Sequence, residues 1–277
     1  MNRLYVVATP IGNLEDVTLR ALRVLSEVSL VAAEDTRTAG VFLRHHGLHP
    51  RLLSYTDHNK QQRIPQILER LAEGDVALVT DAGTPVISDP GVDLVAAARS
   101  AGYDVVSVPG PSAPVAAMSV AGLGGTAFRF AGFLPRSAGE LRRLLSEAAA
   151  RDEVLVAFEA PTRLRKSLEA IAETMPERCI AVCRELTKLH EETFVGTAVE
   201  ALAHFQQPRG EIVVLIEGAG DKKPSTPGDE TALREELTQM RNLGLTRAQA
   251  SALLSQRYRT NRRALYEMWL ATGEKDA

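Results

Sequence analysis

Short apolar runs alternate with helix-like segments through the first part of the chain. Five runs rich in Val, Leu and Ala predict strands, at 4–9, 28–33, 51–55, 75–80 and 104–109. Between them, segments such as 61–74 carry apolar residues at every third or fourth position, which is typical of helices that bury one face. Strand and helix in this alternation indicate a parallel sheet with helices on its faces.

The alternation starts again after the glycines at 122–125. Five further strands are predicted, at 128–134, 153–160, 179–186, 192–198 and 211–218. The loop GFLPRSAGE that follows the first of these is more typical of a surface lid than of a tight phosphate-binding turn. Three short helical patterns, near 231–242, 247–257 and 261–271, close the chain, and Thr246 with Gln249 forms a capping-box signature.

The predicted fold class is therefore α/β, with two α/β domains and a small C-terminal helical domain. We expect the first α/β domain over 1–115 and the second over 116–220. A polar segment rich in Gly and Pro predicts a linker over 221–230, which leaves the helical domain over 231–277.

Composition narrows the class of protein. The 277 residues are 45% hydrophobic and 24% charged, which excludes a disordered chain and a coiled coil. Cys179 and Cys183 are too few for a disulfide framework and lack the neighbours of a zinc site, so we expect no metal and a reduced, cytoplasmic setting. The longest uncharged run, 105–128, is broken by prolines and glycines and no targeting segment is visible, so we expect no membrane association.

Charge is unevenly distributed along the chain. The formal net charge is −3, yet the segment 241–263 holds six arginines and no acidic residue. This segment predicts a local contact with a polyanion. The alternative is a pair of solvated helix faces, which carry charge routinely.

Several catalytic motifs are excluded by their context. GLGGTA at 122–127 follows a helical pattern and precedes a strand, the reverse of the order in a dinucleotide-binding loop. The chain has no P-loop, its GPSAP segment lacks the spacing of a nucleophile elbow, and HEE lacks the second histidine of a zinc protease.

Three loops rich in small residues follow three strands of the first predicted sheet. They are TPIGN at 9–13, TDAGTPVISDPG at 80–91 and PGPSA at 109–113. Functional loops gather at the carboxyl edge of such a sheet, and the first and fourth strands are commonly neighbours. Each loop alone is more often an ordinary turn, but together they predict a ligand pocket that includes Pro10 and Gly12.

Six ordered motifs then give a specific resemblance. They are LYVVATPIGNLEDVTLRAL, AEDTR, TDAGTPVISDPG, PGPSA, GFLPR and CRELTKLHEE, and they span about Leu4 to Gly218. This set resembles the RNA-modifying branch of the tetrapyrrole-methylase family, the class III S-adenosylmethionine-dependent methyltransferases. The resemblance implies a cofactor cleft between two α/β domains, a homodimer, and methyl transfer to the ribose 2′-hydroxyl of a cytidine in the decoding region of 16S rRNA.

The resemblance also implies cofactor contacts at particular positions. In the first domain these are Asp81, Gly83, Thr84, Ser112 and Ala113. Strand ends of the second domain around Phe158, Cys183 and Gly210 are implied to close over the adenosyl group. The 16S rRNA of the small ribosomal subunit is the implied partner, and its predicted contacts are Arg37, Arg247, Arg257, Arg259, Arg262 and Arg263.

Methyl transfer from a sulfonium to a hydroxyl requires an aligned, water-free site and no metal. A base, or a lysine that lowers the pKa of the hydroxyl, assists a poor ribose nucleophile. The candidates are Asp35, Glu159, Arg184, Glu185 and Lys188. For each of them the alternative is a salt bridge or a helix cap.

Two rival functions share part of this evidence. A small-molecule methyltransferase acting on a corrinoid precursor has the same fold and cofactor, but no evident need for the AEDTR and RELTK segments or the basic tail. A non-catalytic RNA-binding module keeps the tail but predicts no affinity for S-adenosylmethionine.

Overall fold

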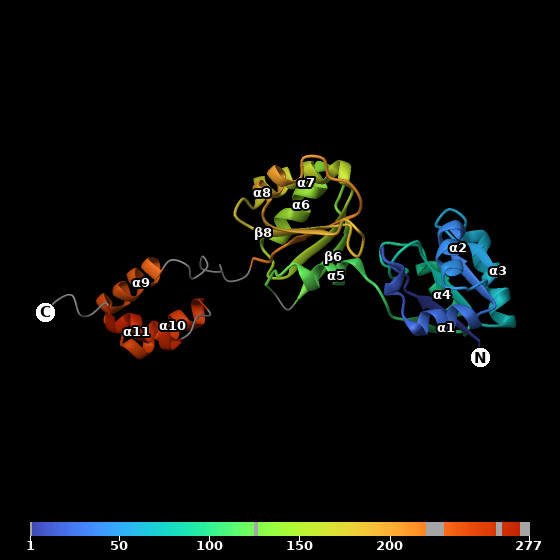
Figure 1. Cartoon of the computed structure of the whole chain (residues 1–277), viewed down its shortest axis with the longest axis horizontal. Coiled ribbons are helices and arrows are strands. Elements are labelled where there is room, and N and C mark those ends of the chain that lie inside the picture. Colours follow the sequence, from blue (N-terminus) through green and yellow to red (C-terminus); the bar gives the residue numbers. More distant parts are fainter. Residues whose placement is uncertain (1, 125–126, 220–229, 259–261, 272–277) are drawn as a thin grey trace. The chain divides into compact units, whose positions relative to one another are not determined.

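The computed structural model describes residues 2–124, 127–219, 230–258 and 262–271, without the side chains of 230–232, 256–258, 262, 263 and 271. The chain forms two compact units, residues 1–218 and 219–277. The first unit holds two five-stranded sheets and the second holds three helices (Figure 1). All ten predicted strands and the three C-terminal helices are confirmed, as is the predicted α/β class.

The first sheet is entirely parallel, in the order β3-β2-β4-β1-β5. Its strands are β1 (Arg3–Val7), β2 (Leu30–Ala33), β3 (Leu52–Ser54), β4 (Val76–Val79) and β5 (Asp104–Val108). β1 pairs with β4 and β5, which confirms that the first and fourth strands are neighbours. The loops that leave these strands therefore begin side by side at one edge.

Helices cover both faces of this sheet. They are α1 (Leu19–Glu27), α2 (Thr36–His45), α3 (Lys60–Glu73) and α4 (Val92–Ser100), with a 3₁₀ turn at Leu14–Asp16. Alternate strand residues face the two layers: Val79 packs in a core with α1 and α2, and Leu78 packs in a core with α3 and α4. Every residue of β2 and β4 is buried, because central parallel strands are covered on both sides.

The second sheet is mixed, in the order β6-β7-β10-β8-β9. Its strands are β6 (Phe128–Phe133), β7 (Val154–Glu159), β8 (Cys179–Arg184), β9 (Glu192–Thr197) and β10 (Ile212–Ile216). β6 and β7 are parallel, and the remaining pairs are antiparallel.

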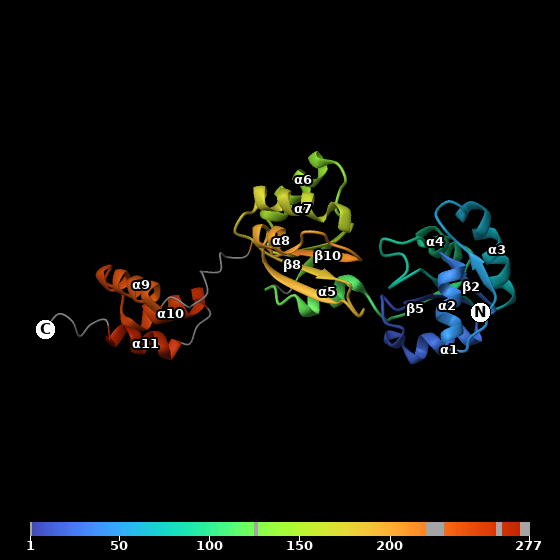
Figure 2. The ribbon, with the colours of Figure 1, turned by 45° about the horizontal axis from the view of Figure 1, so that its top comes forward.

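The two faces of the second sheet carry different helices. One face is covered by α6 (Ala138–Ala149), α7 (Pro161–Thr174) and α8 (Ala198–His204), and the other by α5 (Ala113–Val120), as Figures 1 and 2 show. Helix α5 runs across the domain boundary expected at 115/116 and packs on the second sheet. Leu134, in the loop expected to act as a lid, is buried and donates its N–H to the Phe158 carbonyl (3.0 Å).

The C-terminal unit consists of α9 (Glu230–Asn242), α10 (Arg247–Tyr258) and α11 (Arg262–Ala271). Leu237, Leu254 and Trp269 belong to its core. The Arg241 guanidinium lies 4.5 Å from the centre of the Trp269 ring, so this arginine of the basic segment serves the core. Thr246 and Gln249 make the predicted reciprocal bonds, with the Thr246 N–H 2.9 Å from Gln249 Oε1.

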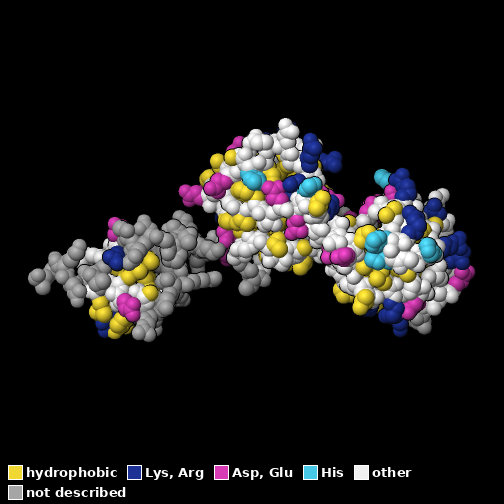
Figure 3. Space-filling view, viewed as in Figure 1, with side chains coloured by type: hydrophobic (Ala, Val, Ile, Leu, Met, Phe, Trp, Pro, Cys, Tyr) yellow, Lys and Arg dark blue, Asp and Glu magenta, His cyan; other side chains and the backbone are white. Residues whose placement is uncertain are grey.

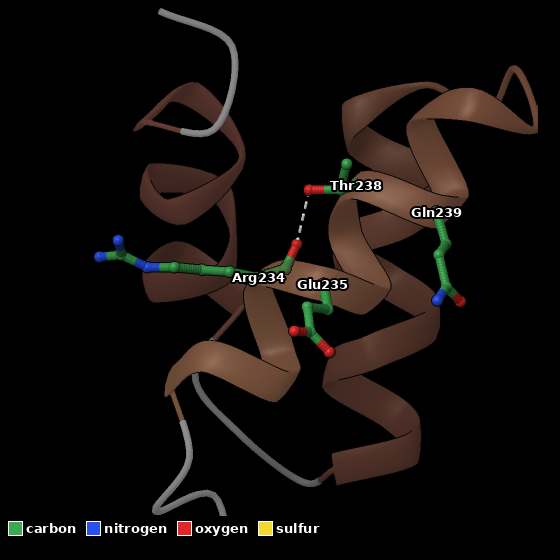
Figure 4. A pocket seen from close by; sticks show the side chains of 4 residues that line it. All are labelled: Arg234, Glu235, Thr238 and Gln239. Carbon is green, nitrogen blue, oxygen red and sulfur yellow. Dashed lines mark hydrogen bonds between the residues drawn. The ribbon is translucent and has the colours of Figure 1, made fainter. Parts of the chain in front are cut away.

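A shallow hollow of about 370 Å³ lies beside α9 (Figure 4). Its lining residues, Arg234, Glu235, Thr238 and Gln239, belong to this helix alone, and Thr238 Oγ1 donates to the Arg234 carbonyl (2.8 Å). The hollow is the polar outer side of one helix rather than a site built by several elements. Among the described residues, every helix is too short or too polar to cross a membrane.

Candidate active site

Three loops meet at the carboxyl edge of the first sheet. The Thr9 N–H donates to the Gly83 carbonyl (2.8 Å), and the Gly83 N–H donates to the Thr9 carbonyl (3.0 Å). Thr84 Oγ1 donates to the Pro111 carbonyl (3.1 Å). The predicted meeting of the loops after β1, β4 and β5 is confirmed, and hydrogen bonds hold all three together.

The loop 80–91 stores backbone strain. Gly83 has a φ of +77°, a left-handed conformation that favours glycine. Val86 and Ser88 also have positive φ values, which cost of order 1–2 kcal/mol each for residues other than glycine. Strain of this kind concentrates at ligand-binding loops.

Carboxylates face one another at the same edge. The Asp35 N–H donates to Asp81 Oδ1 (3.1 Å), which places Asp81 beside the start of α2. Partial burial, and then the charge of Asp81, raise the pKa of Glu34. Partial burial also raises the pKa of Asp81 and of Asp89, and neighbouring carboxylates add to both effects. The edge therefore favours a cationic ligand, which would relieve the repulsion.

An apolar row crosses the second sheet on the face that carries α5. Phe158 and Cys183 lie on either side of Val213 in the strand register, and Phe133 pairs with Phe158. The Phe158 ring packs edge-to-face on Phe130, with ring centres 5.0 Å apart. Burial raises the pKa of the Cys183 thiol, so Cys183 acts as apolar lining and not as a nucleophile.

Two loops join this apolar face to the first sheet. Ile11 packs in one cluster with Leu186, Cys183 and Val213. The Asn13 N–H donates to Thr187 Oγ1 (3.0 Å). A Cβ on Gly12 would lie 2.5 Å from Lys188 Cγ, so only glycine permits this approach. The structure thus places Gly12 against Lys188. It also places the neighbouring Ile11 against the apolar row that contains Phe158 and Cys183.

Lys188 is held by two carboxylates. Its Nζ lies 3.0 Å from Glu185 Oε1 and 3.0 Å from Glu211 Oε2. Burial works to lower the pKa of Lys188, but the bonds to Glu185 and Glu211 outweigh it and raise that pKa. The Glu211 N–H, and then Lys188, lower the pKa of Glu185, whose carboxylate lies against Gly210. Lys188 is therefore a fixed cation at neutral pH, and Glu185 is its counter-ion.

Two catalytic candidates lie on the opposite face of the second sheet. Glu159 and Arg184 both pair with Ile212 in the register, on the side covered by α6, α7 and α8. Glu159 is fully buried and accepts from Arg163 Nε (2.8 Å) and Ser167, while Arg184 Nε donates to Glu192 (2.8 Å). These contacts favour the salt-bridge alternative for both residues.

Asp35 caps α2. Its carboxylate accepts from the Arg37 N–H (2.8 Å) and from the Arg37 guanidinium, and these bonds lower the pKa of Asp35 to about 2. The Arg37 side chain is 90% exposed, so it keeps access to an external partner while it pairs with Asp35. For Asp35 the geometry favours the helix-cap alternative.

The remaining predicted residues are placed unevenly. Pro10 belongs to the loop that Thr9 anchors, and Ser112 and Ala113 begin α5. The Arg247 guanidinium lies 3.8 Å from the centre of the Tyr266 ring. Arg259 lies outside the described residues, as do the side chains of Arg257, Arg262 and Arg263.

Sequence patterns missed some members of this site. Glu34 and Thr187 lie inside the AEDTR and RELTK segments, but nothing in the spacing marks Glu34 as a neighbour of Asp81 or Thr187 as a partner of Asn13. Phe130 and Phe133 both pack on Phe158 because the register of β6 shifts between them, and the sequence pattern does not reveal this irregularity. No group of three or more His, Cys, Asp or Glu side chains arranged for a metal occurs among the described residues.

Comparison with known proteins defines the class. The family model for Tetrapyrrole (Corrin/Porphyrin) Methylases matches residues 3–202. A solved structure titled as the methyltransferase CobJ superposes with a TM-score of 0.59 at 22% identity, over 79% of this chain and 95% of that one, and it shares the fold. The chain belongs to the tetrapyrrole methylase family and is a methyltransferase.

Sequence relatives are more specific. A protein of Synechocystis sp. named ribosomal RNA small subunit methyltransferase I is 42% identical over 98% of this chain and 98% of its own. A Thermotoga maritima protein with the same name is 48% identical over 79% of this chain and 99% of its own. The second relative therefore has no counterpart to about a fifth of this chain, which is about the share of the C-terminal unit.

We predict that Glu159→Ala lowers the free energy of unfolding by about 3 kcal/mol, because it leaves Arg163 and Ser167 without their buried partner. Urea unfolding of the full chain measures this change. The exposed Glu169→Ala, also on α7, is the control and should change stability little. Lost methyl transfer with unchanged stability would instead make Glu159 a catalytic residue.

Proposed function

We propose that this chain transfers a methyl group from S-adenosylmethionine to the ribose 2′-hydroxyl of a cytidine in the decoding region of 16S rRNA. One structural observation carries the proposal: the small-residue loops of the first sheet meet a fixed lysine cation of the second through Gly12, Asn13 and Thr187. The names of the relatives support the choice of ribosomal RNA as substrate.

The residues present fit this methyl donor. Glu34, Asp81 and Asp89 suit a ligand that carries positive charge, and their raised pKa values indicate that no cation of the chain neutralises them fully. The loop around Gly83 and Thr84 lets backbone approach a ligand closely. The row of Phe158, Val213 and Cys183 offers an apolar surface to a flat ring system.

S-adenosylmethionine supplies a methyl group already activated by its sulfonium. The chain then has three tasks: to hold donor and ribose in line, to exclude water, and to make the 2′-oxygen more reactive. We assign the last task to Lys188. Its Nζ donates hydrogen bonds and stabilises negative charge as it develops on the 2′-oxygen, while Glu185 and Glu211 hold it in place.

The C-terminal unit adds a second contact with RNA in this proposal. We propose that its arginines bind rRNA phosphates, namely Arg247, Arg257, Arg259, Arg262 and Arg263, and that Arg37 at the start of α2 contributes as well. The Thermotoga relative lacks a counterpart to a share of this chain about equal to that of the C-terminal unit, and this supports assigning the unit to affinity and not to chemistry. We further propose a homodimer in the cytoplasm, where its ribosomal substrate resides.

The rival with the same fold is a methyltransferase of corrinoid precursors. The decisive experiment incubates purified protein and labelled S-adenosylmethionine with small ribosomal subunits that lack the modification, and in parallel with a tetrapyrrole. We expect label only in the rRNA, at a cytidine 2′-oxygen in the decoding region. Label only in the tetrapyrrole would establish the rival function.

We predict that Asp81→Asn weakens binding of S-adenosylmethionine about 10- to 100-fold, as expected for the loss of a charged hydrogen-bonding partner. Calorimetry over a range of pH measures the change. Protonation of Asp81 removes the charge that attracts the donor, so the affinity of the wild type for S-adenosylmethionine falls as the pH is lowered. Because the pKa of Asp81 is raised, this fall begins at a higher pH than it would for an aspartate with an ordinary pKa.

The Asn variant should lack this fall with pH. Asp104→Asn is the control with the same charge change, because Asp104 lies at the amino end of β5, away from the edge that carries the loops. Equal affinity of the wild type and Asp81→Asn at neutral pH would remove Asp81 from the donor site.

We predict that Lys188→Ala lowers the rate of methyl transfer about 100-fold or more, because a preorganised donor at a developing charge is worth this much. Donor affinity should change less than threefold, since Lys188 acts on the ribose. Single-turnover rates and calorimetry separate the two effects. Lys60→Ala is the control, because Lys60 at the start of α3 pairs with Asp93 at the start of α4 (2.6 Å) and not with Glu185 or Glu211. An equal loss in rate and affinity would place Lys188 in the donor site instead.

A further inference from the structure

A groove of about 310 Å³ runs between α6, α7 and the loop 135–138. Four cationic side chains contribute to its lining, namely Arg136, Arg142, Arg163 and Lys166. Two carboxylates, Glu169 and Glu173, also line it. In Figure 3, Lys and Arg side chains gather at the edge of the second sheet's helical layer, near α7. The groove is formed by the face that carries α6 and α7, away from the row of Phe158 and Cys183.

Two of these cations, Arg136 and Lys166, differ from most others in the second sheet and its helices because they have no ion-pair or hydrogen-bond partner in the part of the chain that the structure describes. Over the described residues 127–219, the Lys and Arg side chains are held by carboxylates or carbonyls, with three exceptions: Arg136, Lys166 and Arg209. Two of the three lie in this one groove. Arg142 adds a loosely held charge, with its Nη2 3.6 Å from Glu173.

The floor of the groove is rigid. Arg163 is anchored by the buried Glu159 and by the Leu134 carbonyl (2.6 Å), and Ser167 bonds to the same carboxylate. These bonds fix the loop before α6 against α7. The exposed side chains of Arg136 and Lys166 therefore extend from a backbone that these bonds hold in place, so a ligand does not have to order the backbone when it binds.

We propose that this groove binds the phosphodiester backbone of the rRNA substrate, at nucleotides away from the reacting ribose. The inference rests on the proposed function, which supplies a substrate long enough to reach the groove. Two free cations and one loosely paired arginine suit successive phosphates, each of which carries a negative charge and accepts hydrogen bonds from Arg and Lys. The two carboxylates weaken the groove for a small free anion. An rRNA that is already held at its reacting nucleotide binds the groove more effectively than a free anion does, because this second contact forms within the same complex.

The test compares two double variants of the full-length protein with equal charge change. Arg136→Ala with Lys166→Ala empties the groove of free cations. Arg143→Ala with Arg151→Ala removes two exposed arginines that pair with Glu147 and Glu153 and do not line it. Affinity for small ribosomal subunits is measured as a function of salt, beside the single-turnover rate at saturating subunits and donor affinity by calorimetry.

We expect the groove variant to lose about tenfold in subunit affinity at low salt. The dependence of its affinity on salt concentration should become shallower, by the amount expected for the loss of about 1–2 phosphate contacts. Its saturated rate and its donor affinity should match the wild type, and the control variant should match it in all respects. An unchanged salt slope, or an equal loss in the control, would overturn the proposal. If the wild-type protein binds subunits through the groove but transfers no methyl group to rRNA, that result would contradict the proposed function and leave the groove proposal standing.

Discussion

The close approach of the Gly12 backbone to the segment 186–188 is the constraint on which the proposed active site depends. A side chain at residue 12 would collide with Lys188, and the hydrogen bond from Asn13 to Thr187 then fixes the position of the two loops. Glu185 and Thr187 both adopt positive φ values, so the second loop is strained to make this contact. Without it, the carboxylates of one sheet and the lysine of the other would have no fixed relation.

The alternation of side chains along the strands separates chemistry from structure in the second sheet. Phe158 and Cys183 face α5, whereas their neighbours Glu159 and Arg184 face α6, α7 and α8. One step along a strand therefore decides whether a polar residue supports the fold or lies near the site. Glu159 and Arg184 therefore lie away from the apolar row, although each directly follows one of its members, Phe158 or Cys183, in sequence.

Much of the fold was predictable because it depends on local patterns. Short Val-rich runs, helical spacing and the capping box at Thr246 all act within a few residues, and the structure has each of them. The loop cluster was predictable because parallel strands share a carboxyl edge. The contact of Lys188 with Glu211 and the approach of Gly12 to Lys188 were not, since each brings together residues that are distant in sequence. Spacing could not show that Arg241 packs on Trp269 or that Arg247 lies over Tyr266.

The carboxylates beside Asp81 have a consequence for turnover. Burial, and then the charge of neighbouring carboxylates, raise the pKa values of Glu34, Asp81 and Asp89. A positively charged ligand would offset both effects. In the proposed reaction, methyl transfer removes the sulfonium charge, so the spent cofactor offers these carboxylates less compensation than the fresh one. The electrostatic cost of the carboxylates would then favour release of the product and its exchange for new donor, without any change in the shape of the site.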